Sequence, residues 1–230
     1  MALIPLLIIR IPSIRKEQEK SSFREDLAEG FGFVKNARGL LPFLMLATTL
    51  NFLIVPLPTL ASYYVKFDHF GGAADLALIM ASFQGGILAG GLLMSVIKGF
   101  KKKMLAIISF TYVIFLGYAL VALTPTGLFW FMAIAASIMA FGIPIINVSY
   151  LTTIQTVVPL KMQGRVNSVD MALSSAAQPF GMILSGVIVE FTGTVNLFLG
   201  CVGLGILVLT LSWFFTDIRH VEKMEEASIE

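Results

Sequence analysis

Four carboxamide side chains are the residues of this sequence best suited to bind something inside an apolar environment. Asn51, Gln84 and Gln178 fall near the middle of long apolar runs, and Asn147 falls toward one end of another. An amide in hydrocarbon needs a partner or a watery cavity, because an unsatisfied one costs several kcal/mol. A bond to a neighbouring helix also satisfies it and contributes about 0.6 kcal/mol on average. Because four such amides occur on four separate runs, we expect at least some of them to line a cavity for a small-molecule substrate.

Residues at the polar border of the fifth apolar run form a second group of candidates. We expect Gly164, Arg165 and Asp170 to belong to a cytoplasmic loop and helix end that gate the path. Asp170 is placed about one turn inside its helix, where its charge would favour the dipole at the amino end. No Asp, Glu, Lys or Arg falls in the middle third of any run. A proton-coupled carrier needs an ionisable group in the membrane, so we expect that group in another part of the transporter.

The sequence lacks the residues that a disulfide framework, a metal site or an enzyme active site would need. The single cysteine, Cys201, excludes a disulfide framework and a cysteine metal site. His69 and His220 are too few and too far apart for a histidine metal cluster. No pairing of a nucleophile with a base occurs in the runs or the short loops. We therefore expect no enzyme activity, no metal and no cofactor.

The elements that must position these residues are membrane-spanning helices. The chain has 230 residues, of which 57% are hydrophobic and 13% are charged, and its mean hydropathy is +0.88. A soluble domain usually carries about 25% charged residues, so a soluble enzyme, a nucleic-acid binder and a disordered chain are all excluded. A helix needs about 20 apolar residues to cross a bilayer. Six runs meet that length: Leu41–Tyr64, Ala73–Ile97, Met104–Leu123, Leu128–Leu151, Val166–Phe191 and Val195–Thr216. We predict an all-α membrane protein whose partner is the lipid bilayer, with no nucleic acid.

The basic residues predict how the chain is oriented in the membrane. Of the 16 Lys and Arg residues, 15 lie in the terminal segments and in alternate loops, and only Lys66 lies on the opposite side. Cytoplasmic loops are the ones enriched in Lys and Arg. Both termini are therefore predicted to be cytoplasmic, which agrees with an even number of spans.

The segment before the first run divides into two parts. Met1–Ile9 is apolar but too short to span, and it lacks the basic start and cleavage site of a signal peptide. We interpret it as the end of a truncated helix, with an interfacial anchor as the alternative. The predicted organisation is a helix end at 1–12, a linker at 13–40, a six-span domain at 41–216 and a cytoplasmic tail at 217–230.

The linker contains the pattern of an amphipathic helix. Phe23, Leu27, Phe31 and Val34 recur at spacings of four, four and three, which puts them on one helical face. We expect this helix to lie on the inner membrane surface. A helix that binds a partner is the alternative.

The six runs show signs of an internal repeat of three. Gln84 in the second run and Gln178 in the fifth are each followed by an Ile-Leu-small-Gly sequence that ends at Gly90 and Gly186. Transporters are commonly built from inverted three-helix repeats. We therefore predict two inverted triplets, with the second and fifth runs in equivalent places.

Three stretches carry a resemblance to a known family. They are DLAEGFGFVKNARGLLPFL before the first run, the basic loop KGFKKK, and VPLKMQGRVNSVDMALSSAAQPFGMILSGVI. In this order they resemble the carboxyl-terminal half of a major facilitator superfamily transporter. The branch is that of bacterial exporters such as macrolide-efflux proteins and the enterobactin exporter.

The resemblance implies the remaining expectations. The six runs would be helices seven to twelve, with the first and fourth against a central cavity and the second and fifth against the other half. The chain would be half of a secondary exporter of amphipathic small molecules in the bacterial inner membrane, using proton antiport and needing an amino-terminal six-helix half. One alternative is a complete six-span transporter that works as a homodimer. Another is the membrane subunit of an ATP-driven transporter, although no ATPase-docking loop with paired alanines occurs.

Overall fold

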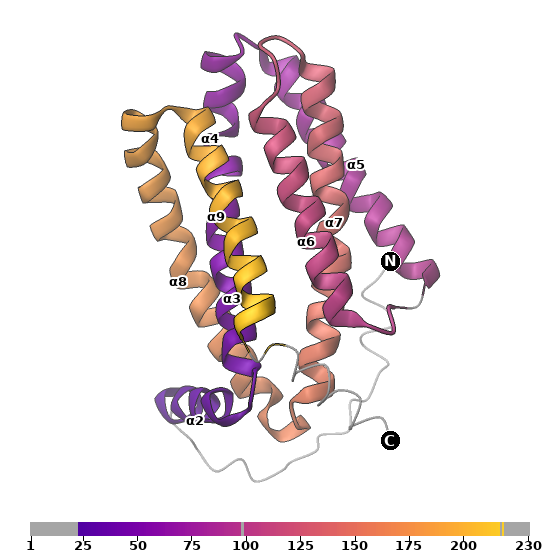
Figure 1. The fold of residues 1–230 in the computed structure, drawn as a ribbon, viewed down its shortest axis with the longest axis vertical. Coiled ribbons are helices and arrows are strands. Elements are labelled where there is room, and N and C mark those ends of the chain that lie inside the picture. Colours follow the sequence, from indigo (N-terminus) through magenta and orange to yellow (C-terminus); the bar gives the residue numbers. More distant parts are fainter. Residues whose placement is uncertain (1–22, 98, 217, 219–230) are drawn as a thin grey trace, which may run out of the picture.

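The computed structural model of the protein describes residues 23–97, 99–216 and 218. Every regular element of these residues is helical (Figure 1). The predicted helix end at 1–12 and the predicted tail at 217–230, except residue 218, lie outside the described residues. The helices in chain order are α2 (Phe23–Asn36), α3 (Leu40–Ile54), α4 (Pro56–Tyr63), the π-helical turn η1 (Tyr64–Asp68), α5 (Ala73–Ile97), α6 (Lys103–Ala122), α7 (Phe129–Val157), α8 (Leu160–Thr192) and α9 (Thr194–Phe215).

Six helical segments are long and apolar enough to cross a membrane, which confirms the predicted all-α fold class. The first segment joins α3, α4 and η1 over Leu40–Asp68, and α5 to α9 supply one span each. The break between α3 and α4 falls at Val55 because Pro56 has no N–H to continue the helical bonding. The fourth span also contains a proline, Pro144, yet α7 continues through it.

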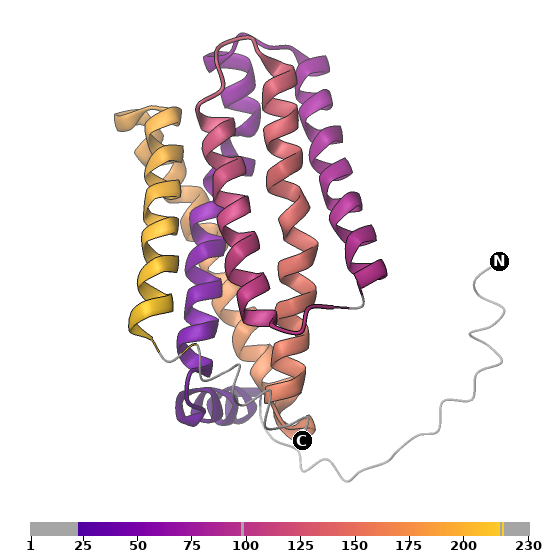
Figure 2. The ribbon, with the colours of Figure 1, turned by 45° about the vertical axis from the view of Figure 1, so that its right-hand side comes forward.

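The spans pack as two interlocked triplets. The first helix of the first triplet, α3, packs on α8 and α9, while the first helix of the second triplet, α7, packs on α5 and α6. The two third helices, α6 and α9, pack on each other. Each leading helix thus contacts the second and third helices of the other triplet, and α3 and α7 run in opposite directions (Figures 1 and 2). This exchange is the arrangement expected of two inverted three-helix repeats.

Small residues let α5 approach α7 closely. Gly86 and Gly90 are buried one turn apart on the face of α5 that meets α7. A Cβ on Gly86 would collide with the carbonyl oxygen of Ser137, and one on Gly90 would collide with that of Phe141. Backbones that approach this closely gain van der Waals contact, which drives helix association in a bilayer.

The buried small residues of α8 place the internal repeat one residue away from the predicted register. The sequence match pairs Gly90 with Gly186, but a Cβ on Gly186 would meet nothing within 4 Å. The residues of α8 that are buried one turn apart, as Gly86 and Gly90 are in α5, are Gly181 and Ser185. One residue corresponds to a rotation of about 100° around the helix axis. The equivalence between α5 and α8 is therefore set by which residues are buried, and not by which residue types match.

Several helix bounds differ from the predicted spans, and the first span ends at Asp68 rather than Tyr64. The fourth span continues to Val157 rather than Leu151, and the fifth begins at Leu160 rather than Val166. The residues predicted as the loop before the fifth run are therefore largely helical, with Pro159 at the start of α8. Because hydropathy reports the hydrocarbon thickness, it cannot detect a helix that extends beyond the membrane. At 33 residues, α8 is about 50 Å long against about 30 Å of hydrocarbon.

The amphipathic helix predicted in the linker is present as α2, which lies across one end of the bundle (Figure 1). This end also holds the 99–102 connection and the start of α8, and we call it the basic end. Val34 is fully buried, whereas Phe31 of the predicted apolar face is 46% exposed. The helix packs chiefly on α8, so protein as well as membrane covers its apolar side.

The opposite end is closed by aromatic packing around η1. The Tyr64 ring contacts those of His69 and Phe198 at centroid distances of 4.5 and 5.2 Å. Its hydroxyl donates to the carbonyl oxygens of Val121 and Ala122. Burial lowers the pKa of His69 below its ordinary value, although the neighbouring Asp68 carboxylate opposes this shift.

The second helix of each triplet is the least covered. In the most apolar window of α5, 17% of the residues are buried, and in that of α8, 11%, against 56% in α6. Large apolar faces of α5 and α8 are therefore left uncovered by the described chain. Lipid or another protein must cover them.

We predict that Gly90→Ala destabilises the bundle, because its Cβ would meet the backbone of Phe141 and lie 2.7 Å from Cγ of Pro144. Overpacking of this kind costs about 1–3 kcal/mol and should lower the melting temperature in detergent by about 2–10 °C. The matched control is Gly91→Ala, whose Cβ would meet open space. Equal melting temperatures for the two variants would show that the α5–α7 contact is not close.

Candidate functional site

A cavity of about 410 Å³, mainly apolar with six polar lining residues, lies between the two triplets. Of its 14 lining residues, six come from α3 and four from α7, and α6 and α8 supply two each. Eight of the residues are apolar, and the polar ones are Asn51, Thr111, Asn147, Tyr150, Asp170 and Ser174. An apolar chamber with a few polar groups is the common form of a small-molecule site.

Two of the four predicted amides line this cavity. Asn51 uses its Nδ2 to donate to the carbonyl oxygen of Ala47 at 2.9 Å, which leaves Oδ1 as an acceptor. Asn147 is exposed and has no hydrogen bond from its side chain within the described chain. The Thr111 hydroxyl donates to the Ile107 carbonyl at 2.7 Å, so it offers the cavity an acceptor only. Asn51 also keeps its second N–H, while the amide of Asn147 has all of its donors and acceptors available.

The other two predicted amides lie elsewhere. Gln84 and Gln178 are exposed, on α5 and α8, the two helices with uncovered faces. Neither is among the residues that line this cavity. Their contact with a substrate stays a prediction.

Asp170 is deeper in the protein than its sequence position indicates. Because α8 begins at Leu160, Asp170 is ten residues inside the helix rather than one turn from its start, too far to act on the helix dipole. It faces the cavity, and its Oδ1 accepts a hydrogen bond from the Tyr150 hydroxyl at 2.7 Å. The Phe43 ring packs on that of Tyr150 with centroids 4.9 Å apart. These three side chains join α3, α7 and α8 beside the cavity.

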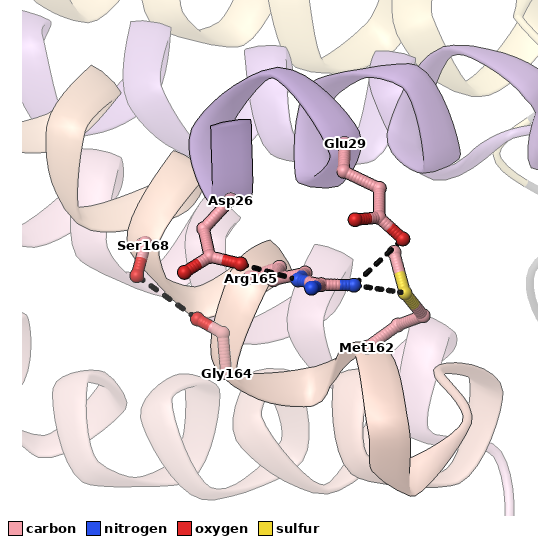
Figure 3. Close-up of polar contacts among 6 residues, drawn as sticks. All are labelled: Asp26, Glu29, Met162, Gly164, Arg165 and Ser168. Carbon is pink, nitrogen blue, oxygen red and sulfur yellow. Dashed lines mark hydrogen bonds and ion pairs between the residues drawn. The ribbon is translucent and has the colours of Figure 1, made fainter. Parts of the chain in front are cut away.

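Arg165 joins α2 to α8 at the basic end (Figure 3). Its Nε lies 2.8 Å from Oδ1 of Asp26, and its Nη1 lies 2.6 Å from Oε1 of Glu29. Nη1 also contacts Sδ of Met162 at 3.8 Å. The two carboxylates are three residues apart, which places them on one face of α2.

Gly164, predicted as part of a loop, lies in the first turns of α8 instead. Its carbonyl accepts a hydrogen bond from the Ser168 hydroxyl at 3.0 Å (Figure 3). A Cβ on Gly164 would meet open space. Its gating role, like that of Arg165 and Asp170, stays a prediction.

Close backbone packing accompanies these ion pairs. A Cβ on Gly30 of α2 would lie 2.7 Å from the carbonyl oxygen of Arg165. The ion-paired side chains are 29% exposed for Arg165, 36% for Asp26 and 56% for Glu29. Solvent-exposed pairs contribute about 0.2–1 kcal/mol each, so the Gly30 contact is expected to hold α2 more firmly than the charges do.

The sequence had no signal for several of these groups. Tyr150, Thr111 and Ser174 are single polar residues in apolar runs, and only the fold brings them to one cavity. Asp26 is 139 residues from Arg165. The spacing of Asp26 and Glu29 on one helical face could have indicated a basic partner, but not which one.

Comparison with known families agrees with this architecture. The model of the Major Facilitator Superfamily matches residues 43–229. The chain belongs to the major facilitator superfamily. No solved structure matches it. The superfamily resemblance implied that the first and fourth spans face a central cavity against a second half, and this stays a prediction.

The curated relatives of this superfamily chain are efflux proteins. It is 25% identical to macrolide efflux protein A of Streptococcus pyogenes over 228 residues, which are 98% of this chain and 55% of the relative. It is also 25% identical to macrolide efflux protein A of Enterococcus faecalis over 185 residues, 79% of this chain and 57% of the relative. The chain spans about half the length of the curated relatives that it matches.

We predict that Gly30→Ala loosens α2 from α8, because the new Cβ forces α2 away from the Arg165 backbone. Backbone amides of α2 should exchange hydrogen about 5–100-fold faster, as expected for a loss of about 1–3 kcal/mol. The measurement is hydrogen exchange followed by mass spectrometry. Gly32→Ala is the matched control, since its Cβ meets open space and alanine favours the helix by about 1 kcal/mol.

The same measurement separates packing from charge. Arg165→Gln removes both ion pairs while keeping the backbone contact, and we expect it to speed exchange in α2 by less than about fivefold. A larger effect from Arg165→Gln than from Gly30→Ala would mean that the ion pairs hold this helix.

Proposed function

We propose that this chain forms the carboxyl-terminal half of a secondary exporter of amphipathic small molecules, driven by proton antiport. The observation that carries the proposal is the mainly apolar cavity with a few polar groups between α3 and α7, the leading helices of the two triplets. Efflux proteins among the relatives support the direction of transport.

The cavity has the composition that an amphipathic substrate requires. Its apolar wall would hold the hydrophobic part of the molecule, and Asn51 and Asn147 would bond to its polar groups. Gln84 and Gln178 would complete the polar lining from the side of the second half. The chain would act as a carrier, without cofactor, metal or enzyme activity.

We propose Asp170 as the proton carrier of this half, in place of the sequence-based expectation that the carrier lies in another part of the transporter. It has the one ionisable carboxylate among the described residues that line the cavity. The Tyr150 hydroxyl would hold the ionised form through its hydrogen bond. Protonation from the external side would weaken that bond by removing the charge, and release of the proton to the cytoplasm would restore it as a substrate is exported.

Transport requires a second wall. In this family's mode of action, two six-helix halves rock around a midplane site. The uncovered faces of α5 and α8 are the surfaces on which an amino-terminal half would pack. A second copy of this chain could cover the same faces, and the homodimer is thus the alternative that the experiment must separate.

The proposed location is the bacterial cytoplasmic membrane, which the chain crosses several times. The basic end, with α2 and the 99–102 connection, would face the cytoplasm, together with both termini. The 15 to 1 distribution of Lys and Arg supports this orientation.

Export is tested in a macrolide-susceptible bacterium that accumulates a radiolabelled macrolide. We expect the chain to lower accumulation when it is co-expressed with the segment of the Streptococcus pyogenes relative that it does not match. Expressed alone at the same level, it should leave accumulation at that of the empty vector, because the cavity lacks its second wall. Export by the chain alone, with a dimer mass in detergent, would favour the homodimer; co-purification with an ATPase would favour an ATP-driven transporter.

We predict that Asp170→Asn abolishes the dependence of export on the proton gradient, because an amide cannot carry a proton. The measurement is macrolide export by the co-expressed halves as the external pH is varied. Glu190→Gln on the same helix is the control, since Glu190 is exposed and outside the cavity. A gradient dependence that survives Asp170→Asn would place the proton carrier elsewhere.

The amides are tested in the same system. Asn147→Leu removes a hydrogen-bonding group worth about 1 kcal/mol, so the apparent affinity for the macrolide should fall about fivefold. If Gln84→Leu has the larger effect, the substrate contacts α5 rather than the cavity between α3 and α7.

A further inference from the structure

A second cavity lies at the basic end, on the other side of α7. It has a volume of about 320 Å³ and is formed by the end of α5, the 99–102 connection, the start of α6 and α7. Its lining residues are Met94, Gly99, Phe100, Lys101, Lys103, Val148, Ser149 and Thr152. None of them lines the cavity proposed for transport.

Both charged side chains that line this cavity are lysines. Lys101 and Lys103 line it, and no carboxylate is among its described lining residues. Lys103 is also the first residue of α6, a helix of 20 residues with no acidic residue in its first turn and no side-chain cap. The free N–H groups of a helix start carry partial positive charge and favour an anion. The lysines and the helix start thus add to the same field.

Ser149 provides independent evidence for a ligand. It is 2% exposed, and its Oγ has no hydrogen-bond partner in the described chain. A buried hydroxyl without a partner costs about 1–3 kcal/mol. The neighbouring threonines are different: Thr152 donates to the Val148 carbonyl at 2.6 Å and Thr153 to the Ser149 carbonyl at 2.9 Å. Of these hydroxyls, only that of Ser149 is left to donate to a bound group.

The wall and the position of the cavity narrow the choice of anion. Met94, Phe100 and Val148 make one side of it apolar. The 99–102 connection joins two membrane spans, so the cavity opens at the membrane surface, where the headgroups of lipids lie. A phosphate beside an apolar chain has both of these properties, and juxtamembrane lysines each attract anionic lipid by about 1 kcal/mol.

We propose that this cavity binds the phosphate headgroup of an anionic phospholipid, with Lys101 pairing its charge and Ser149 Oγ donating to a phosphate oxygen. The lipid would fill the space between the ends of α5, α6 and α7 and stabilise their packing. The site does not depend on the proposed export, since it belongs to the bundle itself.

The test uses the purified chain and thermal unfolding in detergent with added phosphatidylglycerol or phosphatidylcholine. We expect phosphatidylglycerol to raise the melting temperature in a saturable way, and phosphatidylcholine to do so far less. Inorganic phosphate is the third addition. Stabilisation by inorganic phosphate equal to that by phosphatidylglycerol would overturn the assignment to a lipid and leave a site for the free anion.

A matched pair of lysine variants locates the site. Lys101→Gln should weaken phosphatidylglycerol binding about tenfold, as expected for the loss of a charge-assisted bond of about 1.4 kcal/mol. Lys102→Gln, which removes an equally exposed lysine outside the cavity, should change it by less than about twofold. Equal losses from the two variants would indicate general charge attraction and overturn the proposal.

Ser149→Ala gives a signature that a structural role cannot imitate. Without lipid it should unfold at the same temperature as the unmodified chain or a higher one, because it removes a buried hydroxyl that has no partner. With phosphatidylglycerol its gain in melting temperature should be smaller. An unchanged lipid effect would exclude Ser149 from the site, and if this variant does not fold, the exposed lysine pair still decides the outcome.

Discussion

Every polar group of the bundle that lies in hydrocarbon must find a partner, and this constraint orders the structure from the backbone to the cavities. The backbone meets it by forming helices, since each N–H and C=O is then bonded within its own segment. The hydroxyls of the spans meet it locally as well. Thr49, Thr111 and Thr210, for example, each donate to the carbonyl oxygen four residues earlier. Side chains that satisfy themselves in this way leave the faces of their helices free to pack.

Three polar side chains that do not bond to their own helix lie close together on α7. Asn147 and Tyr150 face the cavity shared with α3 and α8, and Ser149 lines the one shared with α5 and α6. Adjacent residues on a helix point in directions about 100° apart, so one turn of α7 serves two cavities. This turn follows Pro144, which removes one backbone hydrogen bond from the helix just before it. The two cavities therefore share one short stretch of α7 as the source of polar lining residues.

The number and order of the spans could be predicted because hydropathy adds up along the chain. The position of each amide along its span could be predicted from the same hydropathy pattern. The face of the helix on which the amide lies could not. A span that is apolar on all sides has no amphipathic pattern to say which way Gln84 or Asn147 points. Hydropathy gives no information on helices beyond the membrane. The segment from Leu160 to Arg165 is polar enough to be taken for a loop, although it is helical. The pairing of Tyr150 with Asp170 joins two spans, and local patterns carry no information about such contacts.

The two triplets follow one plan but are not packed alike. Around α7, glycines bring the helices together, with Gly86 and Gly90 from α5 and Gly117 from α6 each in contact with its backbone. Around α3, a cavity of about 320 Å³ separates α3 and α4 from α8 and α9, and the one of about 410 Å³ lies on the side of α7. The cavity between α5, α6 and α7, in contrast, lies only at the basic end of these helices. Atoms that face an empty space lose their dispersion partners, so moving them sacrifices less contact energy than moving closely packed ones. The helices around α7 are therefore expected to move as a unit, while α3 and the helices beside it can shift against that unit.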